Sequence, residues 1–233
     1  MEKFWIERHE NGVENKKALL IFPHWGAPIW PYKWLAKYFA DYHAIVYRYS
    51  NSLLSSDIEA TFRNFDLLES AALSDIKRLK SEGIRDFSFY GVSLGSVMAL
   101  RAANILAFAH GKVGGVVINL SCADFPFAVW NGSATEPIRE DWRGKGVSYS
   151  EVDQAWFYLS PINNLSRLKE TKILFFGSEK DAVMDPPNVM SLADTFNNFP
   201  KAKIYANAFL GHYLGGAKNF LRVRTIKNFL ERP

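Results

Sequence analysis

The amino-acid sequence predicts an α/β protein with a mostly parallel central sheet and helices on both of its faces. Short apolar runs alternate along the chain with longer segments of helical composition, the order in which parallel strands and crossover helices are built. Several of the runs are apolar at every position, as in strands that are covered on both faces. One such run leads through a glycine-flanked turn directly into a helical segment, at residues 86–106.

The elements can be taken in order from these runs and from the residues that end them. The predicted strands are residues 4–8, 18–22, 44–49, 86–90, 113–120, 172–177 and 202–206. An Asn11-Gly12 turn follows the first strand, and a rigid loop at 23–28 follows the second. The predicted helices are residues 31–42, 57–82, 96–106, 187–197 and 217–230. Asp57 is suited to cap the second helix and Gly83 to end it.

One long stretch breaks this alternation. Residues 121–166 show no clear periodicity, but they carry tryptophans, phenylalanines and tyrosines among glycines, prolines and charges. The stretch is too long for a simple connection and too aromatic for a disordered linker. We interpret it as a small lid insertion in a single domain that spans residues 1–233.

Composition limits the class of protein. With 233 residues, 48% of them hydrophobic, the chain can bury one sizeable core. The net charge of +4 comes from interspersed charges, which favours a solvated surface over a nucleic-acid partner. The single cysteine, Cys122, excludes an intrachain disulfide and a thiolate metal cluster, and we expect a buried thiol. We find no signal-peptide pattern at the N-terminus and no apolar run of membrane-spanning length, and we expect a cytoplasmic protein without a membrane span.

The glycine-flanked turn is Gly91-Val92-Ser93-Leu94-Gly95. A Gly-x-Ser-x-Gly sequence between a strand and a helix is typical of a sharp turn that lifts the serine hydroxyl clear of the sheet. Glycine on either side of Ser93 lets the strand and the helix approach closely. The simpler interpretation is a strand-to-helix turn with a capping serine. The flanking segments favour a nucleophile.

Two further groups follow predicted strands later in the chain. Asp181 ends Gly177-Ser178-Glu179-Lys180-Asp181, directly after an apolar strand, and His212 follows the last strand in Gly211-His212. In this order of serine, acid and histidine the chain resembles the serine α/β-hydrolases, a superfamily of esterases, thioesterases and lipases. The resemblance covers nearly the whole chain. It implies that Ser93 is the nucleophile, His212 its base and Asp181 the acid, with no metal and no cofactor.

The acid has alternatives. Asp124, also just past a strand, competes with Asp181 for this role, and Asp185 is a weaker candidate. Among the histidines, His9, His43 and His110 have less suitable positions than His212. His24 borders the expected pocket, where it contacts substrate or has a plain loop role.

The resemblance also implies an oxyanion hole made of backbone N–H groups. Leu94, the residue after the nucleophile, supplies the first donor. The second comes from the loop after the strand at 18–22. The family often has His-Gly-x in this loop, whereas this chain has Pro23-His24-Trp25-Gly26. By position we assign the second donor to Trp25.

We expect most lid aromatics to be packing, with one or two lining an apolar substrate pocket. The candidates are Trp130 and Trp142, together with His24. The predicted function is hydrolysis of a carboxylic ester or thioester of a small to medium apolar molecule through an acyl-enzyme. The alternative is a binding protein or receptor of the same fold with little or no turnover. The sequence predicts a small-molecule partner and gives no oligomeric state.

Overall fold

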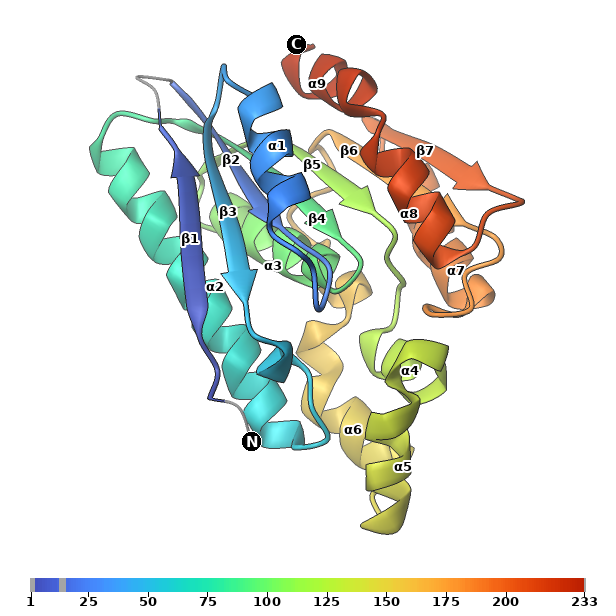
Figure 1. The fold of residues 1–233 in the computed structure, drawn as a ribbon. Helices are drawn as coiled ribbons and strands as arrows, with labels where there is room; N and C mark the ends of the chain where they lie inside the picture. Colours follow the sequence, from blue (N-terminus) through green and yellow to red (C-terminus); the bar gives the residue numbers. More distant parts are fainter. Residues whose placement is uncertain (1–2, 13–15, 233) are drawn as a thin grey trace.

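The computed structural model describes residues 3–12 and 16–232 and contains, in that part of the chain, one seven-stranded sheet (Figure 1). The strands lie in the order β1-β3-β2-β4-β5-β6-β7. Their bounds are Ile6–Asn11 (β1), Lys17–Phe22 (β2), His43–Tyr49 (β3), Asp86–Val92 (β4), Lys112–Asn119 (β5), Ile173–Ser178 (β6) and Ala202–Asn207 (β7). Only the edge strand β1 is antiparallel to its neighbour, so the prediction of a mostly parallel sheet is confirmed.

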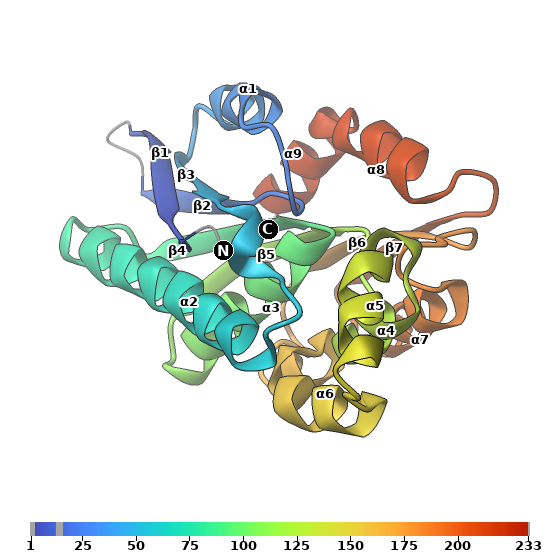
Figure 2. The same ribbon diagram turned by 60° about the horizontal axis from the view of Figure 1, so that its bottom comes forward.

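The helices divide between the two faces of the sheet. Their bounds are Trp30–Tyr38 (α1), Ile58–Ser81 (α2), Leu94–Phe108 (α3), Phe125–Asn131 (α4), Glu136–Gly144 (α5), Tyr149–Trp156 (α6), Pro186–Asn197 (α7), His212–Phe220 (α8) and Val223–Glu231 (α9). Figure 2 shows α1, α8 and α9 on one side of the sheet and α2, α3 and α7 on the other. Helices on both faces are the predicted arrangement.

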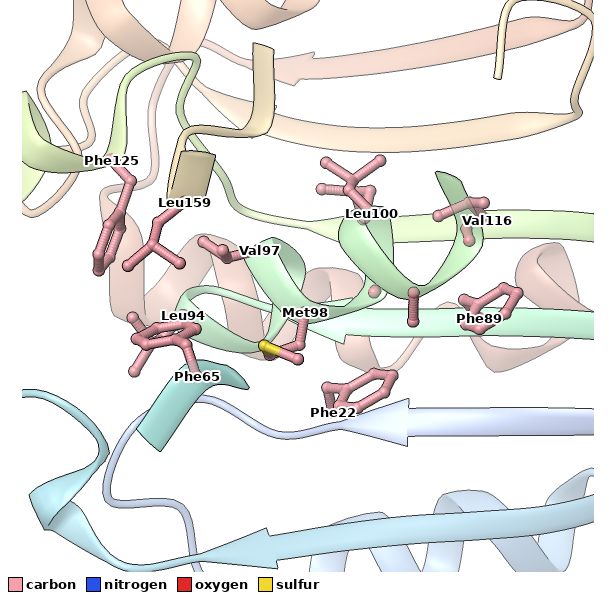
Figure 3. Close-up of a cluster of buried hydrophobic side chains, with 14 of the residues drawn as sticks. Phe22, Phe65, Phe89, Leu94, Val97, Met98, Leu100, Val116, Phe125 and Leu159 are labelled. Carbon is pink, nitrogen blue, oxygen red and sulfur yellow. The ribbon is translucent and has the colours of Figure 1, made fainter. Parts of the chain in front are cut away.

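Alternating strand residues feed two apolar cores. In β2, Leu20 and Phe22 join the core under α2 and α3, whereas Leu19 and Ile21 join the core under α1 and α9. This alternation follows from the twofold period of a strand, and it explains why β2 is apolar at nearly every position. Figure 3 shows part of the larger core, where Val97 and Met98 of α3 lie among strand and lid side chains.

The lid insertion, which runs between β5 and β6, is largely helical. Its main helices are α4, α5 and α6, which lie together at one end of the molecule (Figure 1). Local signals start each helix: Asp124 caps α4, Ser148 and Glu151 form a capping box on α6, and α4 and α5 carry a proline in their first turn. Helices of seven to nine residues are too short to show a clear period in the sequence.

Two other boundaries differ from the sequence prediction. The C-terminal helix is two helices, α8 and α9, and His212 is the first residue of α8. The two have different buried faces, since α8 buries Gly215 and Asn219 whereas α9 buries an apolar stripe that includes Ile226. Strand β1 continues through Asn11, which pairs with Ala44 of β3, so Asn11 of the predicted Asn11-Gly12 turn belongs to the strand instead. No helix in the described part of the chain has both the length and the apolar composition that crossing a bilayer requires.

Candidate active site

Ser93 occupies the sharp turn between β4 and α3. Its backbone angles are φ 52° and ψ −120°, a conformation that residues other than glycine rarely adopt. The flanking glycines are required by space, because a Cβ on Gly91 would lie 2.5 Å from Ser96 Cα and one on Gly95 would lie 2.1 Å from the carbonyl oxygen of Phe22. The Ser93 N–H donates to the carbonyl of Asn119 over 3.0 Å, which ties the turn to the end of β5.

Ser93, His212 and Asp181 form one chain of hydrogen bonds. Ser93 Oγ lies 3.0 Å from His212 Nε2, and His212 Nδ1 lies 2.7 Å from Asp181 Oδ2. Asp181 is fully buried. Its other oxygen accepts the backbone N–H groups of Val183 and Met184 at 3.0 and 2.9 Å. These two backbone hydrogen bonds therefore fix the orientation of the carboxylate that accepts from the imidazole.

Three side chains position His212 at the start of α8. Asn207, the last residue of β7, accepts the backbone N–H groups of the loop at Phe209 and Leu210 with its side-chain oxygen. The Ser178 hydroxyl donates to the carbonyl of Leu210. The Asn119 side chain donates to the carbonyl of Gly216 over 3.1 Å. Strands β5, β6 and β7 thus each hold the segment that carries the imidazole.

The two competing acids have other partners. Asp124 caps α4 by accepting the N–H of Phe127 at 2.9 Å, and Asp185 caps α7 by accepting the N–H of Asn188 at 3.2 Å. Burial raises the pKa of Asp124. Among the three acids, only Asp181 hydrogen-bonds to His212 in the described residues.

The amides of Leu94 and Trp25 both belong to residues that line the cavity beside Ser93. Neither amide donates a hydrogen bond to any other described residue. Leu94 is the first residue of α3, where backbone N–H groups have no partner within the helix. The Trp25 indole N–H donates to the carbonyl of Asn51 over 2.7 Å, which fixes the loop that presents the second amide.

His24 also lines the cavity, and it is paired with Tyr32 of α1. The Tyr32 hydroxyl lies 2.7 Å from His24 Nδ1 and accepts the backbone N–H of His24 at 3.3 Å. Both pairings are satisfied when the hydroxyl donates to Nδ1, which puts the imidazole proton on Nε2. Burial, and then the charge of His212, lower the pKa of His24. The ring is therefore neutral at pH 7.

The cavity has a volume of about 610 Å³, which falls in the range of small-molecule sites. Ser93 and His212 reach it from the carboxyl ends of the strands. Its walls are mostly apolar and come from α1, from α8 and from the part of the lid insertion around α4. The wall includes Trp30, Trp34, Ala134, Thr135, Tyr213 and Leu221.

The structure does not bring Trp130 and Trp142 to this cavity, which corrects the sequence prediction for both. Their rings stack on each other with centroids 5.6 Å apart, and Trp142 is fully buried. The Trp142 indole N–H donates to the carbonyl of Ser56 over 2.8 Å, and the Trp156 indole donates to that of Ile58 over 2.9 Å. These indoles anchor the lid insertion to the loop before α2 and to its first turn.

Sequence reasoning missed Tyr32 and the aromatic residues of α1. The spacing of Trp30 and Trp34, four apart beside a tyrosine, was a signal that could have found them. Cys122 is buried, as expected, and burial raises the pKa of its thiol. In the described residues, no group of three or more His, Cys, Asp or Glu side chains is arranged to hold a metal ion.

No family model matches the sequence, and no curated protein matches it. Solved structures do match. An α/β-hydrolase enzyme from a Medee basin deep-sea metagenome library is 16% identical, with a TM-score of 0.57 over 99% of this chain and 94% of that one. A carboxylesterase of the thaumarchaeon Nitrososphaera gargenis is 15% identical, with a TM-score of 0.59 over 97% and 94%. A lipase-esterase related protein from Clostridium acetobutylicum is 15% identical, with a TM-score of 0.58 over 96% and 99%.

Proposed function

The chain has the α/β-hydrolase fold, and from that premise we propose that it is a serine hydrolase. The reaction is hydrolysis of a carboxylic ester or thioester with an apolar acyl or alcohol part, through an acyl-enzyme. The observation that carries this proposal is the hydrogen-bond chain from Ser93 Oγ through His212 to the buried Asp181, on the wall of an apolar cavity.

In the first half of the reaction, Ser93 Oγ attacks the substrate carbonyl carbon while His212 Nε2 takes the hydroxyl proton. Asp181 accepts the Nδ1–H of the same ring, so that Nε2 is unprotonated before attack and the imidazolium is stabilised after it. The imidazolium then gives its proton to the leaving alcohol or thiol. Water deprotonated by His212 attacks the acyl carbon in the second half and releases the acid and Ser93.

The oxyanion of each tetrahedral intermediate needs donors that are already oriented. The N–H groups of Leu94 and Trp25, which have no partner among the described residues, are suited to this role. Each such donor typically contributes about 3 kcal/mol of transition-state stabilisation. In this proposal His24 adds a third polar contact, because its Nε2–H has no partner in the described residues and its ring borders the cavity. It donates to a polar atom of the bound substrate.

Labelling with a fluorophosphonate is the first test, since the probe reacts with an activated serine. We expect the wild-type protein to be labelled and to hydrolyse p-nitrophenyl esters, and the Ser93→Ala variant to do neither while keeping its thermal unfolding transition. His212→Ala should be nearly as inactive as Ser93→Ala, and the double variant should be no worse than either. A folded wild-type protein that is neither labelled nor active would favour the binding-protein alternative.

The acid is tested by a matched pair of substitutions. Asp181→Asn should lower kcat by about 10⁴-fold, the loss that follows when the triad aspartate of a serine protease is replaced by asparagine. Asp124→Asn removes an equivalent carboxylate just past β5 and should cost far less, because Asp124 serves α4. A larger loss in Asp124→Asn would show that the acid role belongs to that loop.

A further inference from the structure

The outward side of α1 has an unusual composition for a surface helix. Its exposed residues are Trp30, Lys33, Trp34, Lys37 and Tyr38, which recur at the spacing of a single helix face. Trp30 is 71% exposed. The buried side of α1 carries Leu35 and Ala36 and packs on the sheet. The helix therefore has aromatic side chains in the position where a surface helix normally has polar ones.

Helix α8 repeats this composition beside α1. Tyr213, Leu214 and Leu221 are 74%, 69% and 71% exposed, and Lys218 lies on the same outward side. The two helices meet where the Trp34 and Phe220 rings lie 6.3 Å apart, and Figure 2 shows both on the same side of the sheet. We call this surface, made of the exposed residues of α1 and α8 together with Leu221, the mouth face.

The mouth face is continuous with the cavity. Trp30 and Trp34 of α1, Tyr213 of α8 and Leu221, which directly follows α8, are exposed to solvent and also line the cavity that reaches Ser93. An apolar chain that enters from this side therefore meets apolar side chains from the surface inwards. Contiguous exposed apolar surface of this kind usually marks an interaction site.

The charge of the mouth face is positive. Neither residues 15–40 nor residues 195–230 contain an aspartate or a glutamate. Lys33, Lys37 and Lys218 form no ion pair with another described residue. Asp41, in the turn between α1 and β3, is already paired with Lys227. Aromatic and aliphatic side chains with lysines among them are the composition of surfaces that bind anionic lipids.

We propose that the mouth face docks on an anionic lipid surface, with Trp30, Trp34, Tyr213 and Leu221 in the headgroup region and the three lysines against the lipid phosphates and carboxylates. A second copy of the chain is a poorer occupant. A twofold dimer would bring the same positive face against itself, where Lys33, Lys37 and Lys218 of the two copies would repel one another. Docking does not depend on hydrolysis, so it can be tested in the inactive protein.

The test is co-sedimentation of the Ser93→Ala protein with vesicles of phosphatidylcholine alone or mixed with phosphatidylserine. We expect binding to the mixed vesicles, weakened by salt, and little binding to phosphatidylcholine. Adding Lys33→Glu, Lys37→Glu and Lys218→Glu together should weaken binding by at least about 100-fold, from the usual contribution of each basic residue at an anionic membrane.

The matched control changes the net charge equally, with Lys77→Glu, Lys169→Glu and Lys201→Glu, which are exposed elsewhere. This control should keep most of the binding. No binding to mixed vesicles, or equal losses in the two triple variants, would overturn the proposal. So would a dimer that forms in the absence of lipid and is broken by substitutions in the mouth face.

Insertion is measured separately, by quenching of tryptophan fluorescence with brominated acyl chains. Replacing Trp30 and Trp34 by phenylalanine should remove most of the quenching while the protein stays bound. Trp5→Phe, which changes a partly exposed tryptophan just before β1, should leave the quenching unchanged. Quenching that survives the loss of Trp30 and Trp34 would show that another surface meets the lipid.

Discussion

The lid insertion and the mouth face border the same cavity, and both are rich in aromatic residues, but the tryptophans of the lid insertion are buried or half-buried whereas those of the mouth face are exposed. In the lid insertion, Trp142 and Trp156 are fully buried and each donates its indole N–H to a backbone carbonyl. In the mouth face, Trp30 and Tyr213 are mostly exposed. Both regions are therefore rich in aromatic residues in the sequence. Whether those residues pack inside the protein or face solvent depends on the direction in which the rings point.

The lid insertion is also tied down at both of its ends. Asp124 and Asn188 of α7 exchange two backbone-to-side-chain hydrogen bonds of 2.8 Å at its start. Arg101 of α3 donates to the carbonyl of Tyr158 near its end. Thr135, which lines the cavity, turns its hydroxyl back onto the lid carbonyls of Val129 and Gly132. These hydrogen bonds hold the part of the lid insertion that lines the cavity against the rest of the domain.

The largest difference between the two regions is expected when one indole is removed from each. Trp142→Ala should lower the free energy of unfolding by about 3–5 kcal/mol, because it leaves a cavity in the core and an unsatisfied Ser56 carbonyl. Trp30→Ala should change it by no more than about 0.5 kcal/mol, since the side chain is exposed. Urea unfolding followed by circular dichroism measures both. Similar losses in the two variants would mean that the mouth face is packed in solution.

A second prediction concerns the lid wall. Ala134→Leu adds three carbons beside the cavity and should lower kcat/KM for long acyl chains by about 10-fold or more, at roughly 0.8 kcal/mol per methylene displaced, while acetate esters are spared. Ala155→Leu, on the exposed side of α6, is the matched control. If the preference for acyl chain length is unchanged in Ala134→Leu, the acyl chain binds on the mouth-face side of the cavity instead.

The third prediction tests the polar contact on the mouth side. Tyr32→Phe removes the hydroxyl that holds His24, so it should lower kcat/KM by about 5- to 10-fold, the usual contribution of one hydrogen bond. Nitrogen NMR of the imidazole should show the loss of a single Nε2–H tautomer. Tyr38→Phe on the same helix is the control. A fall in activity without a change of tautomer would assign Tyr32 a packing role.

The smallest effect concerns pH. Because the pKa of His24 is lowered in the folded protein, the unfolded chain binds its proton first as pH falls, and wild-type stability decreases through that range. His24→Asn should therefore lose less stability than wild type between pH 7 and pH 5, and the two should behave alike above pH 7. Thermal unfolding across this range is the measurement. Parallel pH profiles would contradict the burial of His24.

The fold could be predicted from the sequence. The proximity of Ser93, His212 and Asp181 could be predicted as well, because each of them follows a strand. The carboxyl ends of parallel strands meet at one edge, so segments far apart in the chain converge there. Sequence reasoning failed for Trp130 and Trp142, because the direction of an indole depends on partners it cannot foresee. The acceptor of Trp142 is 86 residues away in the chain and that of Trp156 is 98.

The backbone of Ser93 also bears on how this chain can change in evolution. A non-glycine residue at φ 52° and ψ −120° carries strain of about 1–3 kcal/mol, which glycine would relieve. A Ser93→Gly protein should therefore melt at a higher temperature than Ser93→Ala, which keeps the strain. A lineage that used this fold only to hold a ligand would gain stability by drifting to glycine at this position. The serine in this chain therefore occupies the turn at a cost in folding free energy that glycine would avoid.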